Sequence, residues 1–435
     1  QKPIAAGLAL DIGTTAISAL LVDLFTGEPL ASGSAGNGQI HYGADVINRL
    51  IESSRPGGLE RLRAAVADDC VTPLVEKICL SRGMTPAQIY RVAFAGNTTM
   101  THLFLGVWAN FIRLEPYVPA FFRLEGLRGS DIRIGVNDCA DVLAAPCVGS
   151  YVGGDITAGV FASMMNRRQA SSLFIDLGTN GELVYGGADF LMACACSAGP
   201  AFEGVDISCG MRAADGAIEA FHIDAATLEP TLTVIGAPDA KPAGICGSGL
   251  IDIICELFRA GVIDAKGRIV RESARIIRDD TGLAGYVLVF AGETGIGRNI
   301  EINETDIDNF IRAKGSIYSA IRCLLATADT RENELDAVYV AGGIGSGINI
   351  GSAIRIGMLP SMPAERFHYL GNTSLMGAYA MLTSRKANSE VKNVGDGMTY
   401  LELSTHPGYM DEFVAACFLP HTDASLFPAA EAELT

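Results

Sequence analysis

The sequence predicts a two-lobed α/β fold in which a mixed sheet flanked by helices occurs twice. Residues 7–15 (G-L-A-L-D-I-G-T-T) form an apolar strand that runs into a turn of small residues, and Ala16–Asp23 returns as a second strand. The same pattern recurs over Leu173–Tyr185, where Asp176 takes the place that Asp11 has in the first copy. A repeat at this long spacing indicates a duplicated lobe rather than a solenoid of short repeats.

A second repeated feature is an apolar strand that ends in Ala-Gly and a turn. Tyr90–Asn97 (Y-R-V-A-F-A-G-N) and Ala337–Ser346 (A-V-Y-V-A-G-G-I-G-S) both have this form. The chain has 435 residues, enough for two cores, and we expect lobe I at residues 1–168, lobe II at 169–371 and a C-terminal segment at 372–435 that returns to lobe I. The predicted helices are Gly153–Met165, Ile251–Phe258 (opened by Gly247-Ser248-Gly249) and Asn372–Met381.

The composition excludes several classes of protein. Hydrophobic residues make up 49% of the chain and charged residues 19%, which favours packed globular structure over disorder. The net charge is −17, with 32 Lys+Arg against 49 Asp+Glu, so neither nucleic acid nor an anionic membrane is expected as a partner. No run of eighteen uninterrupted apolar residues occurs in the sequence, and a membrane span is therefore not expected.

The cysteines and histidines do not form a recognisable metal site in the sequence. Eleven cysteines are scattered without a C-x2-C pair, so neither a zinc site nor a plant-type iron–sulfur cluster is encoded. Their apolar neighbours indicate reduced thiols in the core of a cytoplasmic protein. His102, His222 and His368 have no carboxylate or cysteine partner at ligand spacing, and we expect core or surface roles for them.

The two aspartate-glycine turns have the residues that a nucleotide triphosphate requires. Small residues allow backbone N–H groups to approach phosphates, and carboxylates hold Mg²⁺, usually through water. Either turn alone could be an ordinary hairpin, but two copies predict an ATP site in the cleft between the lobes. We assign Asp11 and Asp176 to Mg²⁺ and to catalysis. The predicted phosphate-binding residues are Gly13, Thr14, Thr15, Gly178, Thr179 and Asn180.

Three further segments supply candidate residues. The turn after Val340 is a glycine loop where a nucleoside could lie against bare backbone, although it has neither a Rossmann G-x-G-x-x-G pattern nor a Walker A lysine. Asp155 either caps the helix that it begins or orients the water that attacks the γ-phosphate. The cofactor-binding residues predicted from these glycine segments are Gly342, Gly343, Gly345, Gly247 and Ser248.

The segment Ala193–Gly204 (A-C-A-C-S-A-G-P-A-F-E-G) is composed of small residues and is uncharged until Glu203. It could be a tightly packed loop between the lobes. Alternatively, it could be a surface loop that touches a large ligand held by another protein, with Ser197 as its donor.

Taken in order, these motifs resemble one family. The chain resembles the C-terminal ATPase domain of the reductive activators of corrinoid-dependent enzymes, in the actin, sugar-kinase and heat-shock-chaperone superfamily. The resemblance covers nearly the whole chain. It rests on Asp11–Thr15, Tyr42–Val46 (Y-G-A-D-V), Gly96–Met100 (G-N-T-T-M), the second aspartate turn, Gly199–Gly204, Ile245–Leu250 (I-C-G-S-G-L), Ala313-Lys314-Gly315, Ala341-Gly342-Gly343 and the ending Leu401-Glu402-Leu403.

The resemblance implies an actin-like ATPase fold with nucleotide between its lobes. It also implies an ATPase that uses ATP and Mg²⁺ to restore the cobalt of a corrinoid protein from Co(II) to Co(I). That partner belongs to a methyltransferase or O-demethylase system. Such activators pass the electron through an N-terminal 2Fe–2S domain, which is absent from the sequence and expected before Gln1. Whether the chain forms a homodimer is left open.

The same resemblance gives Ser197 a chemical role. Co(II) in a corrinoid accepts a weak axial oxygen ligand and Co(I) rejects one, so a donated hydroxyl selects the inactive state. Ser197 is the first candidate, Ser208 the second, and Glu203 a nearby polar support. Three rival functions remain: a small-molecule kinase of the same superfamily, an activator of 2-hydroxyacyl-CoA dehydratase with a cluster bridged between subunits, and a filament or chaperone-type ATPase.

Overall fold

The computed structural model describes residues 5–343 and 347–428. The chain divides into two compact units, each assembled from three segments. The segment that follows residue 371 is split between the units, because its first thirty residues join the first unit and the rest join the second. The first unit is Gln1–Phe174, Val184–Cys194 and Asn372–Leu401, and the second is Ile175–Leu183, Ala195–Gly371 and Glu402–Thr435.

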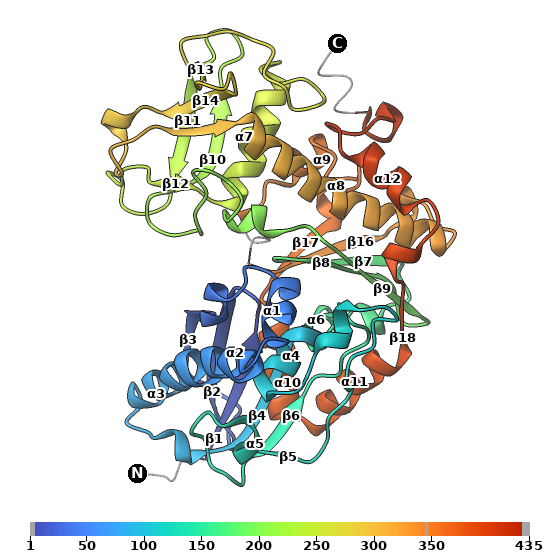
Figure 1. Cartoon of the computed structure of the whole chain (residues 1–435). Coiled ribbons are helices and arrows are strands. Elements are labelled where there is room, and N and C mark those ends of the chain that lie inside the picture. Colours follow the sequence, from blue (N-terminus) through green and yellow to red (C-terminus); the bar gives the residue numbers. More distant parts are fainter. Residues whose placement is uncertain (1–4, 344–346, 429–435) are drawn as a thin grey trace. The chain divides into compact units, whose positions relative to one another are not determined.

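A six-stranded sheet forms the centre of the first unit, in the order β3-β2-β1-β4-β6-β5 (Figure 1). The predicted hairpin is confirmed, because β1 and β2 pair antiparallel with Asp11 opposite Ser18. β4 adds to the other side of β1 in parallel. The strands are β1 (Ala6–Ile12), β2 (Ala16–Asp23), β3 (Pro29–Gly36), β4 (Ile89–Gly96), β5 (Leu127–Arg128) and β6 (Asp141–Ala144).

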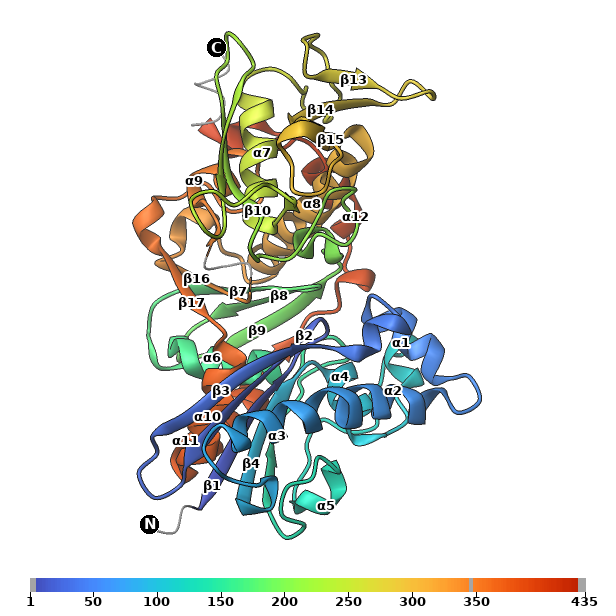
Figure 2. The ribbon, with the colours of Figure 1, turned by 90° about the vertical axis from the view of Figure 1, so that its left-hand side faces the viewer.

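Successive side chains of β1 point to opposite faces of the sheet, and each face packs against a different layer of helices. Leu8 and Leu10 are buried in a cluster with residues of α2 and α3, whereas Ala9 is buried in a cluster with α6 and α10. Figure 2 shows α2 and α3 running along one face of the sheet. The helices of this unit are α1 (Val46–Ser53), α2 (Gly58–Val66), α3 (Thr72–Leu80), α4 (Thr98–Leu105), α5 (Gly129–Ile132), α6 (Gly154–Ser163), α10 (Thr373–Thr383) and α11 (Arg385–Gly397).

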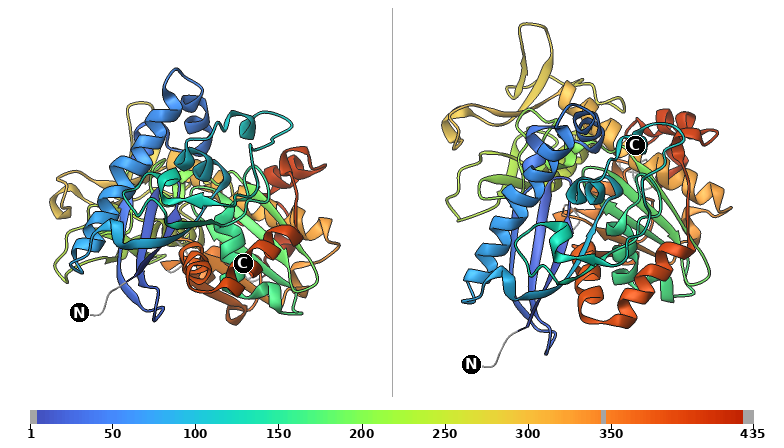
Figure 3. Two further views of the ribbon diagram at one scale, coloured as in Figure 1. Left: turned by 90° about the horizontal axis from the view of Figure 1, so that it is seen from below. Right: turned by 60° about the horizontal axis from the view of Figure 1, so that its bottom comes forward.

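Two glycines allow α6 and α10 to pack closely. A Cβ at Gly377 would lie 2.4 Å from the carbonyl oxygen of Ala158, and a Cβ at Gly159 would lie 2.8 Å from the hydroxyl of Thr373. Both distances are shorter than a van der Waals contact, so neither position accepts a side chain without backbone movement. This contact brings the late helix α10 onto β1 and β4, next to α11, which follows it (Figure 3).

His102 is a core residue, which is one of the two roles that we expected for it. Its Nδ1 donates to the carbonyl oxygen of Thr98 at 2.7 Å, and its Nε2 accepts from the backbone N–H of Ala120 at 3.1 Å. The ring also stacks on Phe121, with centroids 4.0 Å apart. Burial lowers the pKa of His102 to about 4, because a charged ring would be removed from water. The neutral ring is therefore part of the fold.

The second six-stranded sheet has the order β17-β16-β7-β8-β9-β18. Read from β9, five of its strands repeat the order of the first five strands of the first sheet: one strand, a hairpin of two strands, and two strands that follow much later in the chain. The sixth strand, β18, pairs with the outer side of β9. The shared order of five strands confirms the predicted mixed α/β fold. The strands are β7 (Ser172–Leu177), β8 (Gly181–Gly186), β9 (Leu191–Cys196), β16 (Ala337–Ala341), β17 (Phe367–Gly371) and β18 (Met398–Tyr400).

The second unit contains two small sheets that were not predicted from the sequence. Their orders are β11-β10-β12 and β13-β14-β15, and the first lies beside α7 (Figure 1). These elements are β10 (Ala217–Ile223), β11 (Pro230–Val234), β12 (Gly244–Ile245), β13 (Ile276–Arg278), β14 (Ala284–Val289) and β15 (Ile300–Asn303), with the helices α7 (Gly247–Arg259), α8 (Glu304–Thr327), α9 (Ile350–Arg355) and α12 (Tyr409–Ala416).

A buried lysine holds the end of the chain in the second unit. Lys314 of α8 is fully buried, and its ammonium donates to the carbonyl oxygens of Phe418 and Pro420. Burial lowers the pKa of Lys314 to about 7. These bonds tie the segment after residue 401 to α8.

Most of the local predictions are confirmed, with corrections at the helix starts. The three predicted helices correspond to α6, α7 and α10, and α7 begins at Gly247, so the glycine segment lies inside its first turn. The proposal that Asp155 is the N-cap of α6 is wrong, because the N-cap is Gly153. All eleven cysteines lie among the described residues, none of them is in a disulfide, and nine are buried. Within residues 5–343 and 347–428, no helix is both long and apolar enough to cross a membrane.

Candidate functional site

The turn after Asp11 is shaped by glycine. A Cβ at Gly13 would lie 2.4 Å from the carbonyl oxygen of Ala16, so the turn that joins β1 to β2 cannot carry a side chain there. The hydroxyl residues Thr14 and Thr15 follow it and are buried. The predicted loop residues are therefore brought together with Asp11 at one end of β1.

Three asparagines hold this turn, and each one also begins a helix. The side-chain amides of Asn37, Asn97 and Asn372 donate to the Gly13 carbonyl (2.9 Å), the Thr14 hydroxyl (2.9 Å) and the Asp11 carboxylate (2.8 Å), respectively. Their side-chain oxygens meanwhile cap the short helix Gly38–His41, α4 and α10. A single side chain thus fixes both a helix start and an atom of the loop.

The environment of Asp11 is set by the N-terminus of α10. Asn372 donates to one carboxylate oxygen and the hydroxyl of Ser374 donates to the other, both at 2.8 Å. Removal from water raises the pKa of Asp11, and these two hydrogen bonds lower it by a smaller amount. The positive end of the helix dipole also favours a negative group at this position. Asn372 and Ser374 hold the carboxylate in one orientation, as a metal-associated group requires.

Asp155 lies in the first turn of α6, and that turn packs against the same loop. A Cβ at Gly153 would lie 2.4 Å from Cα of Asn97, the residue that bonds Thr14. The carboxylate of Asp155 accepts from the adjacent backbone N–H of Ile156 at 2.9 Å. The first unit therefore groups Asp155 with the Asp11 loop through Asn97.

In the second unit, Asp176 lies at the end of β7 and contacts the glycine turn after β16. Gly342 has a φ of +93°, and a Cβ there would lie 2.7 Å from Oδ1 of Asp176 and 2.3 Å from the Leu177 carbonyl. Only glycine fits this close approach. The loop after Asp176 closes with a bond from Gly178 N–H to the Asn180 carbonyl, at 3.1 Å.

The end of the glycine loop that follows β16 lies near the start of α7. A Cβ at Gly347 would be 3.4 Å from the hydroxyl of Ser248, so the end of the glycine loop passes over the first turn of α7, which also contains Gly247. A Cβ at Gly343 would meet no atom within 4 Å, which leaves its backbone accessible. Gly345 lies outside the described residues.

The segment with Ser197 packs on the turn that follows Asp176. The hydroxyl of Thr179 donates to Oε1 of Glu203 at 2.9 Å, and a Cβ at Gly181 would lie 2.7 Å from Sγ of Cys196. The bond between Thr179 and Glu203 could not be predicted from the sequence, because the two residues are 24 positions apart in the chain.

The two candidate serines differ in availability. Ser197 is exposed, directly after the last residue of β9. Ser208 is also exposed, but its hydroxyl donates to Asp306 at 3.0 Å and accepts from the amide of Asn303 at 3.2 Å. The hydroxyl of Ser208 is therefore committed to the start of α8, and Ser197 is the better candidate.

The carboxylates suit a hydrated Mg²⁺ rather than a metal cage. No group of three His, Cys, Asp or Glu side chains that could bind a metal is found in the part of the chain that the structure describes. Mg²⁺ retains several waters and needs only one or two carboxylates together with substrate phosphates. Asp11, with both oxygens hydrogen-bonded and its orientation fixed, fits that requirement.

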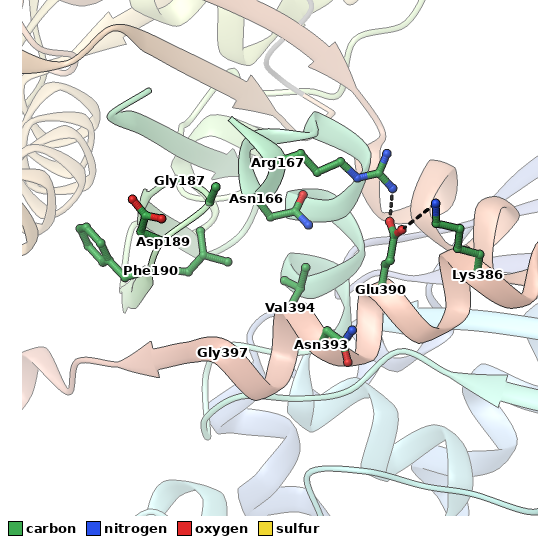
Figure 4. A pocket seen from close by; sticks show the side chains of 12 residues that line it. Asn166, Arg167, Gly187, Asp189, Phe190, Lys386, Glu390, Asn393, Val394 and Gly397 are labelled. Atoms are coloured by element: carbon green, nitrogen blue, oxygen red, sulfur yellow. Dashed lines mark hydrogen bonds and ion pairs between the residues drawn. The ribbon is translucent and has the colours of Figure 1, made fainter. Parts of the chain in front are cut away.

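A cavity of about 530 Å³ in the first unit is separate from these residues (Figure 4). Glu390 lines the cavity together with two basic residues. Its carboxylate forms an ion pair with Arg167 and lies 3.8 Å from Nζ of Lys386. None of the predicted site residues contributes to its lining.

The repeated strand order, with an aspartate and a glycine turn after the first strand of each sheet, defines an actin-like ATPase fold. The chain belongs to the RACo family. One family model, described as the C-terminal domain of RACo, the ASKHA domain, matches residues 170–431, and a second, the RACo middle region, matches residues 6–168. ASKHA domains are nucleotide-binding domains.

Known relatives extend over nearly the whole chain. The corrinoid activation enzyme RamQ of Eubacterium limosum is 31% identical over 95% of this chain and 70% of its own length. A Methanosarcina barkeri reductase of the Co(II) methylated amine-specific corrinoid protein is 23% identical, over 90% of this chain and 73% of its own. A solved structure of a reductive activator for a corrinoid, iron-sulfur protein is 46% identical with a TM-score of 0.91, covering 99% of this chain and 68% of that one.

Proposed function

We propose that this chain binds and hydrolyses Mg²⁺-ATP to drive the reductive activation of a corrinoid protein from Co(II) to Co(I). The observation that carries the nucleotide site is the matched pair of turns. In each sheet an aspartate is the last residue but one of the first strand, and a glycine and a threonine follow that strand, at Asp11–Thr15 and Asp176–Thr179. The relatives, which are named as activators of corrinoid proteins, supply the substrate class.

The chain's own residues would act on the nucleotide mainly by position. The backbone of Gly13 and Gly178 can approach phosphate oxygens, and the threonine hydroxyls beside them can donate to those oxygens. Bound Mg²⁺ would supply charge neutralisation on the phosphates, held by the carboxylates of Asp11 and Asp176. Asp155 would orient the attacking water. The bare backbone of Gly342 and Gly343 would accommodate the nucleoside, with Ser248 at its side.

Ser197 would make the chain bind the inactive Co(II) form of the corrinoid protein in preference to the Co(I) form. The step itself adds one electron to Co(II) and gives Co(I), with the electron supplied by an iron–sulfur reductant. A hydroxyl can ligate Co(II) and is released by Co(I), so the activator would bind the substrate state and leave the product state. The small neighbours of Ser197, Ala198 and Gly199, leave room for a macrocycle.

The experiment mixes the chain with a purified Co(II) corrinoid protein and records the cobalt absorption spectrum and the affinity of the complex. Ser197→Ala should leave the cobalt spectrum of the free partner unchanged on mixing and weaken the complex. Ser208→Ala is the matched control, because its hydroxyl is bonded within the chain, and it should behave as the unmodified protein does. A Ser197→Ala protein with the unmodified spectrum and affinity would remove Ser197 from the site. An absence of phosphate release from ATP in the presence of the partner would refute the ATPase.

A further inference from the structure

A hydrogen bond joins the loop Asp176–Gly181, the proposed second phosphate loop, to the segment 196–204 that contains Ser197. The hydroxyl of Thr179, which is buried in the second phosphate loop, donates to Oε1 of Glu203 at 2.9 Å. Glu203 ends the short helix Pro200–Glu203, which directly follows the exposed Ser197 and its small neighbours. A phosphate-loop hydroxyl is thus bonded to the segment that carries the proposed cobalt ligand.

The two segments also touch at a second point. A Cβ at Gly181 would lie 2.7 Å from Sγ of Cys196 and 3.9 Å from Cβ of Ala198, the two residues on either side of Ser197. The loop Asp176–Gly181 therefore contacts both flanks of Ser197. The loop and the segment are therefore in direct contact, with no residue between them.

The two ends of the short helix differ in how firmly they are held. Gly204 has a φ of +77°, and a Cβ there would lie 2.5 Å from the backbone nitrogen of Met211. The backbone of Gly204 is therefore packed against the backbone of residues 210 and 211. Gly199 also has a positive φ, of +71°, but a Cβ there would meet no atom within 4 Å. A displacement of Glu203 can therefore be taken up at Gly199, on the side of Ser197.

The chemistry of Thr179 makes its bond to Glu203 sensitive to nucleotide. A threonine hydroxyl has a single proton to donate. Phosphate oxygens and a carboxylate are both acceptors, so the proton given to one is withdrawn from the other. An ionised Glu203 beside a phosphate would in addition be repelled by it.

We propose that Glu203 is the positioning residue that couples the nucleotide to the Ser197 segment, by competing with phosphate for the proton of Thr179. This proposal rests on the proposed function, because it requires nucleotide at the second phosphate loop. Phosphate at the loop releases Glu203 and shifts the segment. The coupling is reciprocal. A partner that docks on the segment and draws Glu203 away makes the hydroxyl proton of Thr179 available to a phosphate oxygen.

Hydrogen–deuterium exchange of the whole chain tests the coupling, with and without Mg²⁺ and a non-hydrolysable ATP analogue. In the unmodified protein the analogue should slow exchange over residues 176–181 and change exchange over 196–204 by about two- to tenfold, the effect of exchanging one hydrogen bond. Glu203→Ala should retain the protection at 176–181 and lose the response at 196–204. Glu203→Gln, which keeps an acceptor oxygen but not the charge, should give an intermediate response.

Glu229→Ala is the matched control, since it removes a carboxylate of the same unit whose partner is Arg275. It should keep the full response, and equal melting temperatures of the variants would show that the fold is intact. Protection at 176–181 with no response at 196–204, or an unchanged response in Glu203→Ala, overturns the coupling alone. An unmodified chain with no protection at 176–181 overturns the proposed nucleotide site, and the coupling with it.

Discussion

Asn372 donates a 2.8 Å hydrogen bond to the carboxylate of Asp11, although 361 positions separate the two residues in the chain. The bond exists because α10 packs on β1 and places its first residue at the end of that strand. Asn372 caps α10 with its oxygen and orients Asp11 with its nitrogen. The carboxylate of Asp11 is thus positioned by one of the last helices of its unit.

The first prediction is that Asn372→Asp weakens the binding of Mg²⁺-ATP by about tenfold while it keeps the helix cap. Aspartate is as good an N-cap as asparagine, but its second oxygen would face Asp11 without a proton, and a lost charge-assisted hydrogen bond costs about 1.5–3 kcal/mol. Isothermal titration measures the affinity. Ser384→Asp, a change at the N-cap of α11, is the control and should bind as the unmodified chain does. Equal affinities for both variants would contradict this role of Asn372.

The second prediction separates the roles of the carboxylates. Asp176→Ala should abolish hydrolysis of Mg²⁺-ATP and leave the fold intact, because it removes charge at the phosphates rather than core packing. Asp155→Ala should slow hydrolysis with a smaller loss of nucleotide binding. Phosphate release and isothermal titration measure the two quantities. Unchanged turnover and binding in both variants would show that the site assignment is wrong.

The third prediction concerns the stability of the protein at acidic pH. Because the pKa of His102 falls from 6.5 to about 4 on folding, the unfolded chain binds the additional proton between these values, and the free energy of unfolding should decrease by roughly 3 kcal/mol as the pH falls through that window. Above pH 6.5 this contribution is fully present.

His102→Gln removes this titration and should therefore give a flatter profile in denaturant titrations between pH 7 and pH 4. His41→Gln is the control, because its imidazole is exposed. If the His102→Gln profile is parallel to that of the unmodified chain, His102 is not the responsible group.

The fourth prediction tests the contact between α6 and α10. Gly377→Ala places a Cβ against the Ala158 carbonyl and should destabilise the protein by about 1–3 kcal/mol, as overpacked positions do. It should also weaken nucleotide binding, since α10 carries Asn372. Gly397→Ala, where a Cβ meets no atom within 4 Å, should have a small effect on stability. Thermal melting measures the difference, and similar melting temperatures would refute the close contact.

The sequence was sufficient for the repeated hairpins, because each lies within one short stretch whose residues specify strand, turn and strand. It was not sufficient for the contacts that orient the site. Asn372 lies at the start of a predicted helix, yet its bond to Asp11 depends on the packing of Gly377 on α6, which no local pattern records. The bond between Thr179 and Glu203 was missed for the same reason. The small sheets β10–β15 were not predicted, because the strands of each sheet come from separate stretches of the chain without a repeated motif.

The three asparagines that hold the Asp11 turn have a consequence during synthesis of the chain. Asn37 and Asn97 are translated early, but Asn372 emerges only after the whole second unit up to Gly371 has been made. A nascent or truncated chain without α10 therefore has β1 and the turn after it, but nothing from α10 orients the carboxylate of Asp11. Because a ligand stabilises only the state that binds it, nucleotide cannot stabilise such incomplete chains. If the Asp11 turn binds nucleotide as proposed, nucleotide therefore stabilises only chains that have been translated through α10.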